Sequence, residues 1–91
     1  MTEKTNPEPW KIIVLPPVKK RLSKVPRKER TRILDAIYGL KTNPFSHDLR
    51  PMRGRPFWRL RVGDWRVLLE VETGKLTITA VAAGTRGNIY K

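Results

Sequence analysis

The chain has 91 residues, of which 20 are Lys or Arg and 8 are Asp or Glu, giving a formal net charge of +12. A domain of this size buries only a thin core, and the lack of cysteine excludes disulfides, thiolate catalysis and cysteine-ligated metal sites. The single histidine excludes a two-histidine acid–base mechanism. So strong a positive charge predicts a polyanionic partner, either nucleic acid or an acidic protein.

The first half of the chain predicts one strand followed by two helices. Residues 1–9 are polar and contain two prolines, which is typical of a flexible tail ahead of a single domain at 10–91. Residues 10–15 are rich in β-forming side chains and end at a Pro-Pro pair, so we expect a strand there. Apolar side chains then recur at helical spacing over 17–25 and 29–41, and prolines end both segments.

Three strands are predicted in the second half, at 57–62, 65–72 and 75–83, after an irregular stretch at 45–56. The dipeptides Gly63-Asp64 and Thr73-Gly74 are typical of two-residue hairpin loops between them. The expected fold is therefore α+β with the order β-α-α-β-β-β. A helical hairpin packs on one face of a small antiparallel sheet.

Two-residue loops fix the register of these strands, and the register divides the sheet into two faces. The face expected to pack on the helices contains Trp58, Leu60, Val62, Val67, Leu69, Val71, Leu76 and Ile78. Trp65 belongs to the same face. Because both loops independently predict one apolar face, we expect that face to be the core.

The opposite face of the predicted sheet gathers positive charge. It carries Arg59 and Arg61 on one strand and Arg66 on the next, with Arg61 directly opposite Arg66. Like charges in that arrangement destabilise a strand pair, so folding alone gives little reason for them. Guanidiniums are planar donors that match phosphate oxygens, and the cluster predicts a phosphate-binding site. An ordinary charged surface, neutralised by Glu70 and Glu72, is the alternative at this point.

The segment 57–70, FWRLRVGDWRVLLE, and the ending 84–90, GTRGNIY, resemble the RelE/ParE superfamily of toxins from type II toxin–antitoxin systems, most closely the RelE branch. The resemblance runs from about Trp10 to the end. It implies a cytoplasmic, metal-free endoribonuclease, an mRNA interferase that cuts mRNA on the ribosome and inhibits translation. It also implies a hetero-oligomer with an acidic antitoxin. Neither a cofactor nor membrane association is expected.

The resemblance also assigns roles to individual side chains. The expected catalytic residues are Arg61, Arg66, Arg86 and Tyr90, and the expected RNA- or phosphate-binding residues are Arg53, Phe57 and Arg59. Guanidiniums stay protonated, so the arginines are suited to charge stabilisation rather than to proton removal. Tyr90 is the first candidate for the base, because neighbouring cations favour a phenolate. His47, in the proline-rich stretch, is expected to be a solvated loop residue.

Two other functions stay open from the sequence. One is a ParE-type toxin that inhibits DNA gyrase by protein binding, and the other is a catalytically degenerate RNA-binding relative. Some RelE relatives carry lysine where this chain has Arg59 and Arg61, and many superfamily members carry histidine where it has Thr85. These differences favour a degenerate relative. The joint presence of Arg61, Arg66, Arg86 and Tyr90 favours the nuclease.

Overall fold

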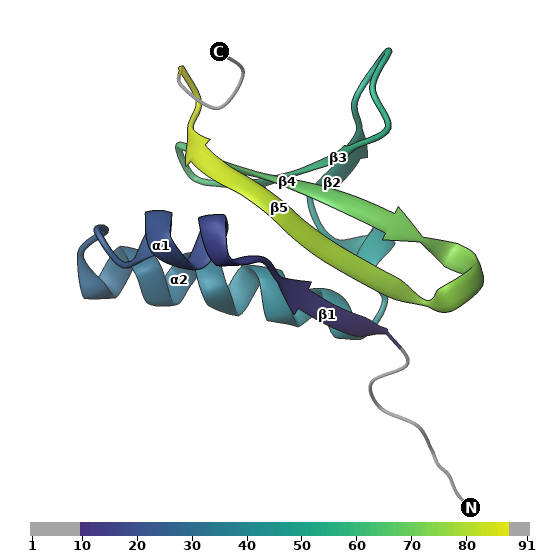
Figure 1. Ribbon diagram of the computed structural model, residues 1–91, viewed down its shortest axis with the longest axis horizontal. Coiled ribbons are helices and arrows are strands. Elements are labelled where there is room, and N and C mark those ends of the chain that lie inside the picture. Colours follow the sequence, from purple (N-terminus) through teal and green to yellow (C-terminus); the bar gives the residue numbers. More distant parts are fainter. Residues whose placement is uncertain (1–9, 88–91) are drawn as a thin grey trace, which may run out of the picture.

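Two helices cover one face of a sheet in the computed structural model, which describes residues 10–87 (Figure 1). The elements follow in the order β1 (Lys11–Val14), α1 (Pro16–Leu22), α2 (Arg27–Tyr38), β2 (Leu49–Pro51), β3 (Trp58–Val62), β4 (Trp65–Glu72) and β5 (Thr77–Thr85). Short 3₁₀ turns occupy Gly39–Lys41, Pro44–Ser46 and Thr73–Lys75. The predicted tail at 1–9 and Tyr90 lie outside the described residues.

The strand order within residues 10–87 is β1-β5-β4-β3-β2. The expected α+β class, with a helical hairpin on one face of the sheet, is confirmed. The sheet is mixed rather than purely antiparallel, because β1 pairs with β5 in parallel while the other pairs are antiparallel. The long connection that leaves β1 contains α1 and α2, and parallel strands need a long connection of this kind. The predicted irregular stretch also contains β2, a short edge strand ending in Pro51, which an edge tolerates.

The core lies between the helices and the sheet. The helices contribute apolar side chains at helical spacing, and the strands contribute every second residue. Fully buried side chains include Val18, Leu22, Ile33, Ile37, Leu40, Val67, Leu69 and Ile78. Because this face is closed by the hairpin, the polar residues of the same strands point to the open face of the sheet.

The register of β3 on β4 agrees with the sequence. Val62 lies opposite Trp65, and Leu60 lies opposite Val67. Gly63 has a φ of 60°, as the first position of a type II′ turn requires, whereas Asp64 is not in the positive-φ region. The faces of β3 and β4 are therefore the predicted ones.

The register of β4 on β5 differs from the predicted one. A 3₁₀ turn forms where a two-residue loop was expected, and it ends at Leu76 with a φ of 47°. Glu72 consequently pairs with Thr77 rather than with Lys75. The shift is two residues over 69–72, which preserves the faces there, so Ile78 stays in the core. A bulge between Leu68 and Leu69 makes the shift three residues over 65–68. Leu76 does not stay in the core, because its side chain lies in the turn and is 43% exposed.

Candidate functional site

A pocket of about 360 Å³ is lined by residues that point to the face of the sheet opposite the helices. Its walls come from the start of β2, from β3 and β4, and from the end of β5. The lining residues are Asp48, Arg50, Arg59, Arg61, Arg66 and Arg86. Five guanidiniums thus share one concave site with a single carboxylate.

The strand register explains how four of these arginines meet. Arg61 lies directly opposite Arg66 across β3 and β4, and Arg50 lies directly opposite Arg59 across β2 and β3. Each pair places like charges at the closest cross-strand distance, which costs stability. Two such pairs side by side produce a strongly positive face that the fold does not need.

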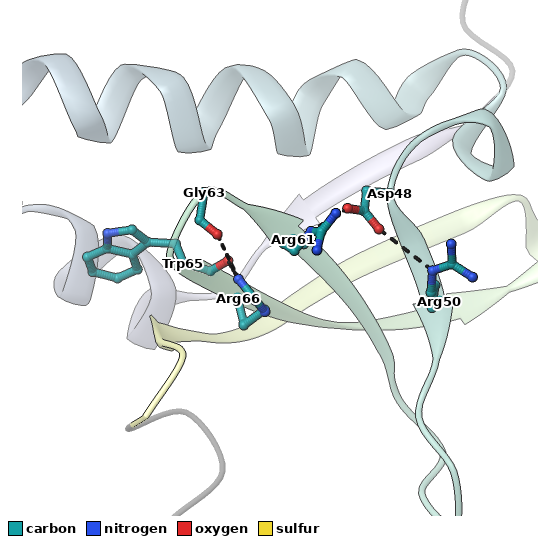
Figure 2. A network of polar contacts seen from close by, with 6 residues as sticks. All are labelled: Asp48, Arg50, Arg61, Gly63, Trp65 and Arg66. Carbon is teal, nitrogen blue, oxygen red and sulfur yellow. Dashed lines mark hydrogen bonds and ion pairs between the residues drawn. The ribbon is translucent and has the colours of Figure 1, made fainter.

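Arg66 is the central member of the pocket, and its residue is only 9% exposed. Its Nη1 donates hydrogen bonds to the backbone oxygens of Gly63 at 2.8 Å and Trp65 at 2.9 Å (Figure 2). Within residues 10–87 no carboxylate lies within ion-pair distance of its guanidinium. Burying a charge without a counter-ion is costly, so the site is electrostatically suited to an incoming anion.

Asp48 sits between two of the arginines (Figure 2). Its Oδ2 accepts a hydrogen bond from Nε of Arg61 at 2.6 Å, and its Oδ1 is 3.8 Å from Nε of Arg50. The backbone N–H of Arg61 also donates a hydrogen bond to the backbone oxygen of Asp48 at 3.1 Å. Asp48 therefore engages the guanidinium of Arg61 through Nε.

Sequence reasoning missed Asp48 and Arg50, because both lie in the stretch expected to be irregular. The available signal was the polar–apolar–polar alternation of Asp48, Leu49 and Arg50, which fits a short strand with Leu49 in the core. Three prolines nearby hid that signal. Pairing this strand with β3 would have placed Arg50 opposite Arg59.

Arg86 reaches the pocket from the end of β5. The last pair of the β4–β5 ladder joins Trp65 and Thr85, and the N–H of Arg86 then donates to the Asp64 oxygen at 2.8 Å. This bond fixes the backbone of Arg86 to the β3–β4 turn, beside Arg66. The four arginines expected from the sequence at positions 59, 61, 66 and 86 are thus brought together.

Arg53 and Phe57, expected to bind RNA, do not line the pocket. Arg53 is exposed in the β2–β3 loop, which projects beyond the sheet, and Phe57 is half-buried just before β3 (Figure 1). His47 is exposed and also lies outside the pocket lining, as expected for a solvated loop residue. Glu72 pairs with Lys75 at 3.8 Å rather than with the arginine cluster.

Residues 10–87 offer neither a metal-binding cluster nor a membrane-spanning helix. No three His, Asp or Glu side chains in this part of the chain are grouped so that they could hold a metal ion. None of the helices there is long and apolar enough to cross a membrane.

Searches against protein-family models and against curated proteins give no significant match. Solved structures do match. The RelBE2 toxin–antitoxin complex of Mycobacterium tuberculosis contains a chain with a TM-score of 0.76 and 17% identity, covering 86% of this chain and 99% of that one. The RelE–RelB complex of Pyrococcus horikoshii contains a chain with a TM-score of 0.75 and 23% identity. That match covers 88% of this chain and 98% of the other. The RelB–RelE complex of Methanococcus jannaschii contains a chain with a TM-score of 0.68 and 26% identity. That match covers 86% of this chain and 94% of the other.

These matches span nearly the whole length of the chains they compare. The free RelE toxin of E. coli also matches, with a TM-score of 0.61 and 12% identity. The protein therefore has the fold of the RelE toxins, and the resemblance seen in the sequence is confirmed at the level of the fold.

Proposed function

We propose that the protein is a RelE-type toxin that cleaves mRNA, and that the arginine pocket binds the scissile phosphate. The observation that carries the proposal is the buried guanidinium of Arg66, which has no carboxylate partner within residues 10–87 and stands among four further arginines. A guanidinium is planar and can donate two parallel hydrogen bonds to the oxygens of one phosphate. The RelE-like fold supports the same assignment.

When RNA is cleaved by its own 2′-hydroxyl, the bonding or charge of three kinds of oxygen atom changes. The 2′-oxygen attacks phosphorus, the bond to the 5′-oxygen breaks, and negative charge builds up on the non-bridging oxygens. Arg61 and Arg66 face each other across the strands, where both suit the stabilisation of that charge. Arg86 joins them from the end of β5, where its N–H is bound to the β3–β4 turn. Its charge is suited to stabilise the negative charge on the departing 5′-oxygen.

The proton of the 2′-hydroxyl needs an acceptor, and the proposed site offers two. Tyr90 is the candidate from the family resemblance. Asp48 is a second candidate on a specific observation: within residues 10–87 it is the one carboxylate that lines the pocket, and it accepts a hydrogen bond from Arg61. A carboxylate can take a proton at neutral pH, whereas a guanidinium cannot.

Positioning of the RNA by the ribosome completes the proposal. The described part of the pocket contains no histidine, so its intrinsic acid–base chemistry is weak, and an external template that orients the 2′-hydroxyl would supply much of the rate. The protein would then act in the cytoplasm, where translating ribosomes are found. The cluster of arginines favours this function over gyrase inhibition by protein binding, which has no use for a phosphate-binding site.

An acidic antitoxin is the proposed protein partner. The chain carries a net charge of +12, and the structures with the same fold include complexes of RelE with RelB. A partner of opposite charge would form a hetero-oligomer and shield the arginine pocket until it is removed.

Primer extension on cellular mRNA tests the proposed function. Expression of the wild-type protein should produce new 5′ ends within translated messages, and the Arg66→Ala variant should produce none. Arg55→Ala is the matched control, because Arg55 is exposed in the β2–β3 loop and does not line the pocket. Intact messages together with a block of DNA supercoiling by the wild-type protein would instead identify a gyrase inhibitor.

A further inference from the structure

The β3–β4 turn that orients Arg66 is held from the opposite side of the sheet by the helical hairpin. Trp65 and Arg66 are neighbours on β4, so their side chains point to opposite faces, and Figure 2 shows the indole directed away from the guanidinium. The indole Nε1 donates a hydrogen bond to Oε1 of Glu29 in the first turn of α2. The guanidinium of Arg21 in α1 lies 5.0 Å from the centre of the indole ring.

The other end of the same turn is also in contact with α2. Guanidinium atoms of Arg32 lie 3.2 to 3.4 Å from the place that a Cβ on Gly63 would occupy. Gly63 and Trp65 are the two residues whose backbone oxygens accept hydrogen bonds from Nη1 of Arg66. Both acceptors of Arg66 are thus on residues that α2 contacts from the helix side.

The residue between them, Asp64, supplies the backbone oxygen that holds the N–H of Arg86 at 2.8 Å. The three-residue segment from Gly63 to Trp65 therefore fixes two of the pocket arginines. Catalytic geometry is sensitive to such supports, since a displacement of about 1 Å can cost on the order of 100-fold in rate.

We infer that Glu29 and Trp65, with Arg32 at the other end of the turn, are positioning residues for the phosphate pocket. This helix-side clamp sets the place of Arg66 and Arg86 without touching the RNA. The inference rests on the proposed function, because it assigns new residues to the same site.

Affinity for inorganic phosphate is the first readout, measured on the full chain by NMR titration of the arginine Nε–H signals. Glu29→Ala and Trp65→Phe remove the acceptor and the donor of the clamp, and Glu29→Gln keeps an acceptor oxygen. We expect Glu29→Ala and Trp65→Phe to weaken phosphate binding about tenfold, with Glu29→Gln close to the wild type. Loss of the negative charge of Glu29 would by itself strengthen the binding of phosphate. Weaker binding by Glu29→Ala would therefore not be explained by the change in net charge.

Single-turnover cleavage of mRNA on programmed ribosomes is the second readout. Glu29→Ala should lower the rate at saturating ribosomes by about 10- to 100-fold, whereas Lys28→Ala, an exposed neighbour on α2, should leave it unchanged. Thermal melting separates the clamp from folding, because Glu29→Gln and Glu29→Ala should melt within a few degrees of each other while differing in phosphate affinity. If Trp65→Phe does not fold, the two Glu29 variants still decide.

The two readouts separate this inference from the proposed function. Wild-type affinity and rate in Glu29→Ala would overturn the clamp while leaving the nuclease intact. Weakened phosphate binding in Glu29→Ala, with no cleavage by any variant including the wild type, would support the clamp and overturn the nuclease.

Discussion

Arg66 and Asp48 carry opposite charges in the same pocket but in very different settings. Arg66 is nine-tenths buried and is held by two backbone oxygens. Asp48 is partly exposed, with a side chain 36% accessible, and it pairs with Arg61, whose side chain is 61% accessible. A phosphate entering the pocket would meet a fixed donor in Arg66 and an oriented donor in Arg61. Asp48 is then the group beside them that can accept a proton.

Asp48→Asn tests that role at the scale of one atom. The amide oxygen can still accept the hydrogen bond from Arg61, but the side chain can no longer take a proton or repel phosphate. We expect cleavage on programmed ribosomes to fall by about 100-fold or more, while affinity for inorganic phosphate rises. Tyr90→Phe is the comparison variant and should keep most of the activity. The reverse pattern, with a large loss in Tyr90→Phe alone, would assign the proton to Tyr90.

The β3–β4 hairpin is the element on which the site depends most. Gly63 combines a φ of 60° with close contact to Arg32, so a side chain there is strained by the backbone and crowded by its neighbour. Gly63→Ala should lower the free energy of unfolding by about 1 to 2 kcal/mol. Urea unfolding of the pure protein measures the change.

Gly74→Ala provides the matched control for that measurement. A Cβ on Gly74 would meet nothing within 4 Å, and its φ is not positive. The substitution should be neutral or slightly stabilising, because alanine restricts the unfolded chain more than glycine does. Equal effects of the two substitutions would show that the β3–β4 turn is not the constrained element we describe.

The same hairpin shows why part of the site was predictable from the sequence. A two-residue loop with glycine first has few geometries, so the pairing of Arg61 with Arg66 followed from counting residues. Thr73-Gly74 allowed a longer 3₁₀ turn, and the predicted place of Leu76 in the core was therefore wrong. Strand β2 has only three residues, one of which is a proline. So short a segment has too little alternation to be distinguished from a loop, and Asp48 and Arg50 were therefore missed.

Over the whole molecule, five of the 20 basic residues and one of the 8 acidic residues line the pocket on the open face of the sheet. Neutralising a phosphate of single-stranded RNA releases counter-ions, and the logarithm of the affinity falls with the logarithm of salt by about 0.7 per phosphate. Arg59→Ala should reduce this slope by about 0.7, since Arg59 lines the pocket and has no carboxylate partner within residues 10–87.

Fluorescence anisotropy over a range of salt concentrations gives the slope. The ligand is a short RNA with methylated 2′-hydroxyls, which cannot be cut. Arg27→Ala, on the exposed side of α2, changes the net charge equally and should alter the slope less. Identical slopes for the two variants would mean that RNA affinity depends on the net charge of the protein and that the RNA does not bind in the pocket.

Single-turnover cleavage of mRNA on programmed ribosomes tests the central claim most directly. The wild-type protein should cut within translated codons without added metal. Arg66→Ala should lower the rate by about 100- to 1000-fold, because it removes a preorganised donor to the developing charge. Arg66→Lys should restore only part of it, since a point charge cannot replace a bidentate fork. Cleavage at the wild-type rate by Arg66→Ala, or no cleavage by the wild type, would contradict the account.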